Sequence, residues 1–422
     1  MKPAYFTLFP LFIVGMLLAV SCDKSPLHDE EVPMGELPDP IRIELRSVEK
    51  KMIGSDQAFA FDFFENVYRE EAEDEDANFM VSPLSLSMAL MMTSNGAAGE
   101  TKSAMRTTLH LDGYGDEEVN AYYKKLKEAL LKTDPSTKLS IANAIFTNQL
   151  VNIHKAFIQT NQSYFDATIQ KVNFGDPATV GIINGWAEEH TNGLIKKVIE
   201  RTQSLDLMYL LNAIYFKGIW TTQFDKKDTS RKPFTHEDGE RANVDMMHQT
   251  ATFNYTEDRT FQLIQLPYGN QAFSMMVLLP VEGISLGEAV TVLSGDGYWS
   301  GLQSMLSGAE VVLSLPKFKT EYSKKLNDVL TTMGMGIAFS DMADFSGMSD
   351  YNAKISFVKQ DTYISTDEEG TEAAAVTTVG IEVTALPSPR KVIFNANRPF
   401  LYLIQENSTG AILFMGVVKH FK

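Results

Sequence analysis

Residues 368–389 read EEGTEAAAVTTVGIEVTALPSP, and the character of the side chains alternates along this segment. One face of the alternation is uncharged and consists of Thr371, Ala373, Ala375, Thr377, Val379, Ile381 and Val383. Glu372 and Glu382 lie on the other face. A period of two is typical of a strand with one buried face, but glycines and alanines weaken a permanent strand. The pattern predicts a segment that can join a sheet without being committed to it, although a plain edge strand and loop fits the same composition.

Around this segment, strand-like and helix-like stretches alternate from about residue 51 to the end of the chain. Phe273–Leu279 and Val311–Leu315 are apolar runs that predict strands. Residues 400–404 and 412–418 flank a turn and predict a pair of strands. Ser82 and Pro83 predict an N-cap and a helix start. Since no linker or repeat divides this part, one large α+β domain replaces the two or three domains that the length suggests.

The composition excludes several classes of function. The chain has 422 residues, with 37 Lys and Arg against 54 Asp and Glu, and the net charge of −17 argues against a nucleic-acid partner. A hydrophobic fraction of 44% and a charged fraction of 22% are those of a globular protein, not of a disordered or polytopic membrane chain. One cysteine excludes an internal disulfide and sites with four thiolate ligands.

Motifs for catalysis and metal binding are missing as well. The seven histidines are scattered without metal-ligand spacing, and no GxSxG elbow is present. Residues 96–103 superficially resemble a phosphate-binding loop, but Thr101 precedes Lys102 where glycine is required. We therefore expect no metal, no cofactor and no enzymatic activity.

The N-terminus has the features of an export signal. Lys2 precedes an apolar run of about 13 residues, which suits a signal peptide better than a membrane span. The sequence LAVSC at residues 18–22 resembles a bacterial lipobox, so residues 1–21 are expected to be removed and Cys22 to carry a diacylglycerol. Residues 22–50, acidic and proline-containing, are expected to form a tether. This predicts a cell-envelope lipoprotein of the outer membrane or cell surface; an ordinary secretory signal and a secreted protein are the alternative.

Short motifs follow one another in a fixed order from residue 51 onward. They are Asn78–Ser85, Gly96–Thr101, Asn143–Phe146, Ile183–Trp186, Thr191–Gly193, Leu211–Trp220, Val244–Met247, Leu266–Tyr268, Leu315–Phe318, Ala343–Gly347 and Asn397–Phe400. In this order the chain resembles the serpin family of serine protease inhibitors, in a bacterial lipoprotein-type form. The resemblance implies an α+β serpin fold with three β-sheets, about eight or nine helices and an exposed reactive-centre loop at about residues 370–389.

The resemblance extends to the hinge of that loop. The residues that match inhibitory members are Glu368, Gly370, Thr371, Ala373, Ala374, Ala375, Val376 and Thr377. Non-inhibitory members commonly carry bulky, charged or proline residues there. The match implies a suicide substrate: a protease attacks the loop, forms an acyl-enzyme, and is distorted when the loop inserts as a new strand. A non-inhibitory serpin that acts as a binding or carrier protein is the alternative, which the alanine run disfavours.

By the family's spacing from the hinge, the resemblance implies a reactive bond at Thr384–Ala385, with Val383–Thr384 as its neighbour. Small or β-branched residues there suit elastase-like or subtilisin-like serine endopeptidases, and papain-like cysteine proteases would read Val383. The target endopeptidase is the implied partner, together with a membrane through the N-terminal lipid, and the protein is expected to be a monomer.

Six further residues match positions that support sheet opening. They are Ser82, Ser85, Asn212, Trp220, Lys317 and Gln360. Lys317 is the implied partner of Glu368. Trp220 matches the tryptophan under the point where the loop first inserts, and plain core packing is the alternative role for it. Gln360 stands where animal members usually have a histidine, so any titration near pH 6.5 would be lost.

Overall fold

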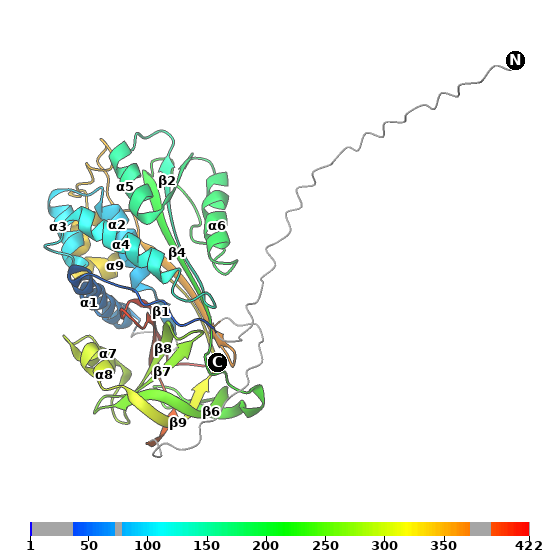
Figure 1. Ribbon diagram of the computed structural model, residues 1–422. Coiled ribbons are helices and arrows are strands. Elements are labelled where there is room, and N and C mark those ends of the chain that lie inside the picture. Colours follow the sequence, from blue (N-terminus) through cyan, green and yellow to red (C-terminus); the bar gives the residue numbers. More distant parts are fainter. Residues whose placement is uncertain (2–36, 72–77, 372–389, 422) are drawn as a thin grey trace. The chain divides into compact units, whose positions relative to one another are not determined.

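The computed structural model describes Met1 and residues 37–71, 78–371 and 390–421 (Figure 1). The described residues from 37 onward belong to one compact unit. They contain nine α-helices, in agreement with the eight or nine that we expected. The α-helices are α1 (Ser47–Glu70), α2 (Pro83–Ser94), α3 (Gly99–Thr108), α4 (Asp116–Leu130), α5 (Lys155–Phe165), α6 (Ala178–His190), α7 (Leu286–Leu293), α8 (Tyr298–Ser304) and α9 (Asn327–Leu330).

Six strands form the first sheet, in the order β10-β11-β12-β4-β2-β3. They are β10 (Phe318–Lys325), β11 (Lys359–Thr366), β12 (Gly370–Thr371), β4 (Met208–Ile219), β2 (Lys138–Asn148) and β3 (Thr168–Val172). All neighbours are antiparallel except β2 and β3, which are parallel. The order shows that β12, only two residues long, occupies a central position in this sheet.

Nine strands form the second hydrogen-bonded network, in the order β1-β15-β14-β8-β7-β6-β9-β13, with β5 also paired to β6. They are β1 (Phe79–Val81), β5 (Ser230–Thr235), β6 (Arg241–Glu257), β7 (Phe261–Tyr268), β8 (Phe273–Pro280), β9 (Ser307–Pro316), β13 (Lys391–Asn395), β14 (Phe400–Glu406) and β15 (Ile412–Val418). The long strand β6 pairs with β5 near its start and with β7 near its end. We expected three sheets, and the structure shows two hydrogen-bonded networks. The larger network has two parts, which share β6.

The strands expected from apolar runs are present. β8 and β9 contain the two runs, and β14 pairs with β15 as an antiparallel hairpin. Every residue of β8, β14 and β15 is buried, which explains why these strands show continuous apolar runs instead of alternation.

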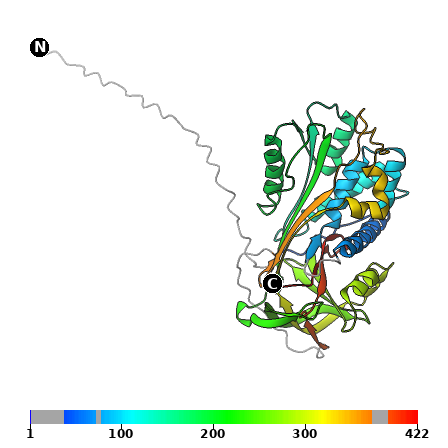
Figure 2. The same ribbon diagram turned by 180° about the vertical axis from the view of Figure 1, so that it is seen from behind.

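Helix α2 begins at Pro83 as expected, and lies between the two sheets because it contacts both β4 and β15. Ser82 is the N-cap residue, but its hydroxyl donates to the carbonyl oxygen of Leu413 at 2.7 Å instead of receiving a helix amide. Helix α6 covers the opposite face of the six-stranded sheet, where it packs on β2 and β4. Both views show α6 on one side of this sheet and α2 to α4 on the other (Figures 1 and 2). The six-stranded sheet is thus covered by helices on both faces.

The expected boundary between tether and domain at residues 50 and 51 is wrong, because it falls inside α1. Ile43 and Leu45 are already buried, and the amide of Ile43 donates to the Ser408 hydroxyl at 3.0 Å. The reason is a polar anchor: Glu49, almost fully buried, pairs with Arg46 and Lys125. Residues 2–36, including Cys22, lie outside the described residues. Among the helices that the structure describes, none is both long and apolar enough to cross a membrane.

Candidate functional site

The central feature of the six-stranded sheet is the interval between β4 and β11. β11 pairs with β10 along its whole length, and β4 pairs with β2. In the described part of the chain, β4 and β11 are connected only through β12, in which Thr371 lies opposite both Gly218 and Thr366. From these residues back to the starts of the two strands, at Met208 and Lys359, the facing edges of β4 and β11 do not pair with each other. The sheet therefore has room for a longer strand.

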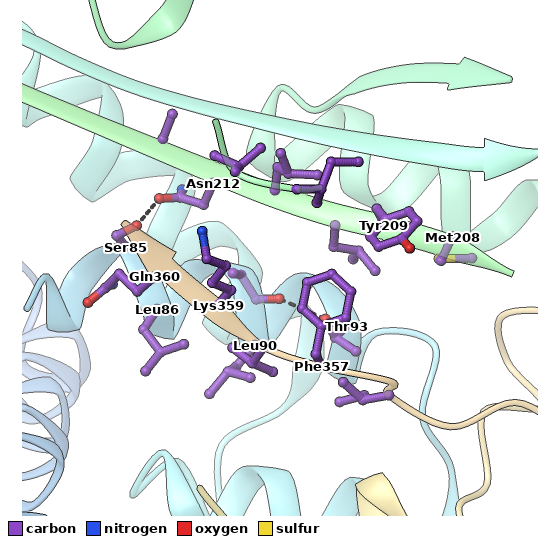
Figure 3. A pocket seen from close by; sticks show the side chains of 18 of the residues that line it. Ser85, Leu86, Leu90, Thr93, Met208, Tyr209, Asn212, Phe357, Lys359 and Gln360 are labelled. Carbon is purple, nitrogen blue, oxygen red and sulfur yellow. Dashed lines mark hydrogen bonds between the residues drawn. The ribbon is translucent and has the colours of Figure 1, made fainter. Parts of the chain in front are cut away.

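A cavity of about 170 Å³ lies at this interval. Figure 3 shows Leu86 and Leu90 from α2, Met208 and Tyr209 from β4, and Phe357 preceding β11, all lining it. The lining also includes Trp186 of α6. Since α2 and α6 cover opposite faces of the sheet, the cavity passes between β4 and β11. An extended peptide segment would fill it and pair with both strand edges.

Ser82, Ser85, Asn212 and Gln360, which match the family's sheet-opening positions, all line the cavity. Figure 3 labels Ser85, Asn212 and Gln360 there. The side-chain amide of Gln360 makes two hydrogen bonds to the backbone of Ser82. Its oxygen accepts from the Ser82 backbone amide and its NH₂ donates to the Ser82 backbone carbonyl oxygen, both at 2.9 Å. Ser85 donates to the side-chain oxygen of Asn212. The start of α2 is thus bonded to β11 by one residue and to β4 by another, and these bonds do not join the two strands to each other.

Asn143 on β2 extends this cluster and was not among the predicted site residues. Asn212 donates to its side-chain oxygen at 2.6 Å, and Asn143 donates to the carbonyl oxygen of Phe165 at 2.7 Å. Asn143 is 1% exposed. The sequence offers one signal for Asn143, which is an amide side chain within an otherwise apolar strand motif. Such a residue indicates a polar cluster, because a buried amide requires hydrogen-bond partners.

The predicted pair of Lys317 and Glu368 is present, with 2.8 Å between nitrogen and oxygen. Glu368 also accepts from the hydroxyl of Thr229 at 2.8 Å. Burial raises the pKa of the Glu368 carboxyl, but the hydrogen bonds from Lys317, the backbone and Thr229 outweigh burial and lower it. Glu368 therefore stays ionised, and holds the turn after β11 to the residue that precedes β5 and to the residue that links β9 and β10.

Trp220 is 1% exposed and lies next to the turn between β11 and β12. Its ring nitrogen donates to the carbonyl oxygen of Asp367 and its backbone amide to that of Glu369, both at 2.9 Å. Glu369 in turn pairs with Lys226. Trp220, which directly follows β4, thus holds the turn that leads into the predicted loop through hydrogen bonds to two of its residues, Asp367 and Glu369.

The remaining predicted residues cannot be placed. Ala373, Ala374, Ala375, Val376, Thr377, Val383, Thr384 and Ala385 lie outside the described residues, as does Cys22. No group of three or more His, Cys, Asp or Glu side chains is arranged to hold a metal ion within the described ranges.

Comparison with known proteins places this geometry in a family. The model of the serpin family, described as serine protease inhibitor, matches residues 55–420. The chain belongs to the serpin family. Intracellular coagulation inhibitor 2 of Tachypleus tridentatus is a serpin relative that is 36% identical over 356 residues, which are 82% of this chain and 86% of that protein.

Solved serpin structures have the same fold. The native state of tengpin, a thermophilic serpin, has a TM-score of 0.80 and 34% identity, and covers 92% of this chain and 98% of tengpin. Human thyroxine-binding globulin complexed with its hormone has a TM-score of 0.78 and 28% identity, and covers 89% of this chain and 99% of the globulin. The serpin fold expected from the motifs is thereby confirmed.

Proposed function

We propose that this serpin inhibits endopeptidases as a suicide substrate that traps them by loop insertion. One observation carries the proposal: β12 already enters the sheet between β4 and β11, above a cavity that a longer strand would fill. The hydroxyl of a serine protease attacks the carbonyl carbon of Thr384, the bond to Ala385 breaks, and the new amine leaves. Insertion of the freed loop then displaces the protease before water cleaves the ester. The serpin itself supplies no catalytic group.

The register in which β12 pairs with β4 and β11 supports this mechanism. Thr371 lies opposite Gly218 on β4 and Thr366 on β11. Continuing both ladders by six residues brings residue 377 opposite Asn212 and Gln360 at once. Residue 377 is a threonine on the uncharged face, so its hydroxyl would enter the polar cluster of Ser82 and Ser85. Residues 379 and 381, valine and isoleucine, would then face the apolar part of the cavity.

Binding of a small molecule is the second candidate function, favoured by the likeness to the hormone complex of thyroxine-binding globulin. The small residues at 373–375 support inhibition instead, because a charged or bulky residue on the buried face of an inserted strand would be costly. Elastase-like and subtilisin-like serine endopeptidases are the proposed targets, because Val383, Thr384 and Ala385 suit pockets for small side chains. Papain-like proteases are included because Val383 suits them.

We also propose that the mature protein is a monomer anchored to the cell envelope through a lipid on Cys22. The support is the lipobox-like sequence before Cys22 and the lack of any other cysteine. Replacing Cys22 by serine should shift the protein from the detergent-rich to the aqueous phase in a detergent-partition assay. Unchanged partition of the Cys22→Ser protein would contradict the anchor, as expected of a secreted form.

The inhibitor proposal is tested by incubation with pancreatic elastase, subtilisin, trypsin and papain. A denaturant-stable band with the summed mass is expected for elastase or subtilisin, together with a released C-terminal fragment that begins at Ala385. Mass analysis of the fragment locates the reactive bond. If every protease cleaves the loop and none is trapped, the proposal is wrong.

A further inference from the structure

The hydroxyl of Tyr268 has one partner in the described structure, and that partner is Thr371. The two side-chain oxygens are 2.6 Å apart, and both residues are buried, at 0% and 2% exposure. The ring of Tyr268 stacks on that of Trp220, with 4.4 Å between centroids and 11° between planes. A buried phenol without a partner is costly, so this position favours a hydroxyl-bearing residue at the start of the loop.

Tyr268 is held in place by contacts that do not involve the loop. The amide of Gly269 donates to the Ile219 carbonyl at 2.7 Å, and the amide of Thr221 donates to the Pro267 carbonyl at 2.9 Å. The backbone on both sides of Tyr268 is therefore bonded to the end of β4. Burial also raises the pKa of the Tyr268 phenol, so its proton is retained. The ring is a preformed feature of the body against which the loop residue docks.

Two glycines allow β12 to approach β4 at this point. A Cβ atom on Gly370 would lie 2.1 Å from the carbonyl oxygen of Gly218. One on Gly218 would lie 2.8 Å from the ring of Tyr268. A side chain at position 370 would therefore push the backbones of β12 and β4 apart, and one at position 218 would collide with the Tyr268 ring that contacts Thr371.

We propose that Tyr268 is the positioning residue that seats Thr371 and thereby sets the register in which the loop inserts. A strand that slips by one residue turns every side chain to the other face of the sheet. Here a slip would direct the carboxylate of the next residue in the sequence, Glu372, toward the phenol. The hydrogen bond to Thr371 selects the register that buries the uncharged face. This inference rests on the proposed function, because the register matters only if the loop inserts.

The test uses the full-length protein and variants that remove single hydroxyls: Tyr268→Phe, Thr371→Val and the double variant. Thr366→Val is the matched control, because Thr366 lies directly opposite Thr371, is equally buried, and has a hydroxyl without a hydrogen-bond partner among the described residues. Thermal unfolding of the intact proteins verifies that all variants fold.

The first measurement is hydrogen exchange of the Gly370 and Thr371 amides, without any protease. Each single variant should speed exchange about tenfold, the double variant no further, and the control not at all. The second measurement is the number of serpin molecules consumed per protease trapped, which should rise severalfold in the same three variants and stay unchanged in the control.

Unchanged exchange in Tyr268→Phe would overturn the proposal, whatever the inhibition data. Faster exchange with an unchanged consumption ratio would also overturn it, because Tyr268 would then hold the loop without guiding insertion. If the wild-type serpin traps no protease, the proposed function fails, while the exchange data still decide whether Tyr268 seats Thr371.

Discussion

Gln360 holds Ser82 through both ends of its side-chain amide, one accepting and one donating. A neutral amide does this at every pH, which is the physical difference from a histidine at the same position. A histidine would keep the acceptor only in its neutral form. The bond between α2 and β11 is therefore expected to be independent of pH in this protein.

We predict that Gln360→His makes stability depend on pH near the ordinary histidine pKa of about 6.5. Protonation removes the acceptor for the Ser82 amide, so the folded state disfavours the charged form and stability falls as pH decreases through this range. The measurement is the urea midpoint of variant and wild type between pH 5 and 8. A constant difference between the two proteins across this range would refute the prediction.

Thr371→Arg is predicted to convert the inhibitor into a substrate. A guanidinium in the pocket beside Tyr268 and Trp220 would be buried without a carboxylate partner, at a cost of several kcal/mol. The stable complex with elastase or subtilisin should disappear while loop cleavage continues, as seen by denaturing electrophoresis. Thr371→Ser, which keeps the hydroxyl, is the control and should still trap. Persistence of the complex in Thr371→Arg would contradict the mechanism.

At the scale of elements, the register of β12 predicts which residues meet after insertion. Val376 should come opposite Ala213, since Thr371 lies opposite Gly218. Directly opposed strand residues are close enough for a disulfide. In a Cys22→Ser background, the pair Val376→Cys and Ala213→Cys should form a disulfide after loop cleavage.

The slipped pair, Val376→Cys with Ile214→Cys, serves as the comparison and should stay reduced. Disulfide formation is followed by mass after alkylation of free thiols. A bond in the slipped pair, with none in the predicted pair, would show that insertion starts in another register.

The joint between α1 and α4 is predicted to weaken in acid. Burial alone would raise the pKa of Glu49, but hydrogen bonds from Lys125 and Arg46 lower it to about 2. Because the folded pKa lies below the unfolded one, the joint adds up to about 3 kcal/mol above pH 4.5, and this is lost as pH falls toward 2.

Glu49→Gln should therefore lower the urea midpoint at pH 7, and should lower it by less than half as much at pH 3, where part of the stabilisation remains because the folded carboxyl is still mostly ionised. Glu117→Gln, on an exposed position of α4, is the control and should behave like wild type at both values. An equal loss in Glu49→Gln at both pH values would point to packing instead of charge.

At the scale of the whole molecule, β4 and β11 leave an interval at the centre of a sheet in which, among the described residues, only the two-residue strand β12 pairs with them. A strand inserted there would bury its uncharged face and complete two ladders. The intact protein should therefore be less stable than its cleaved form. We predict that loop cleavage raises the unfolding temperature by on the order of 10 °C or more.

Scanning calorimetry before and after cleavage of the loop measures this difference, with cleaved Thr371→Arg as the control that should gain little. An unchanged unfolding temperature in the cleaved wild type would mean that the loop does not insert.

The strands with apolar runs, β8, β9, β14 and β15, and the start of α2 at Pro83 were predictable from the sequence, because a run of large apolar residues and a proline at the first helical position are local signals. The start of the domain was not predictable, because Glu49 can be buried only when it pairs with Lys125, which is distant in the chain. The same reason applies to Asn143 and Tyr268, whose partners lie on other strands.

By itself, the sequence determined that residues 371–383 can form a strand with one uncharged face, because a period of two is a property of neighbouring residues. The tertiary structure alone decided that such a strand has a place, between β4 and β11, and that Thr371 begins it opposite Gly218. The register of β12 and the interval between β4 and β11 depend on which distant strands pair, and no local sequence pattern contains that information.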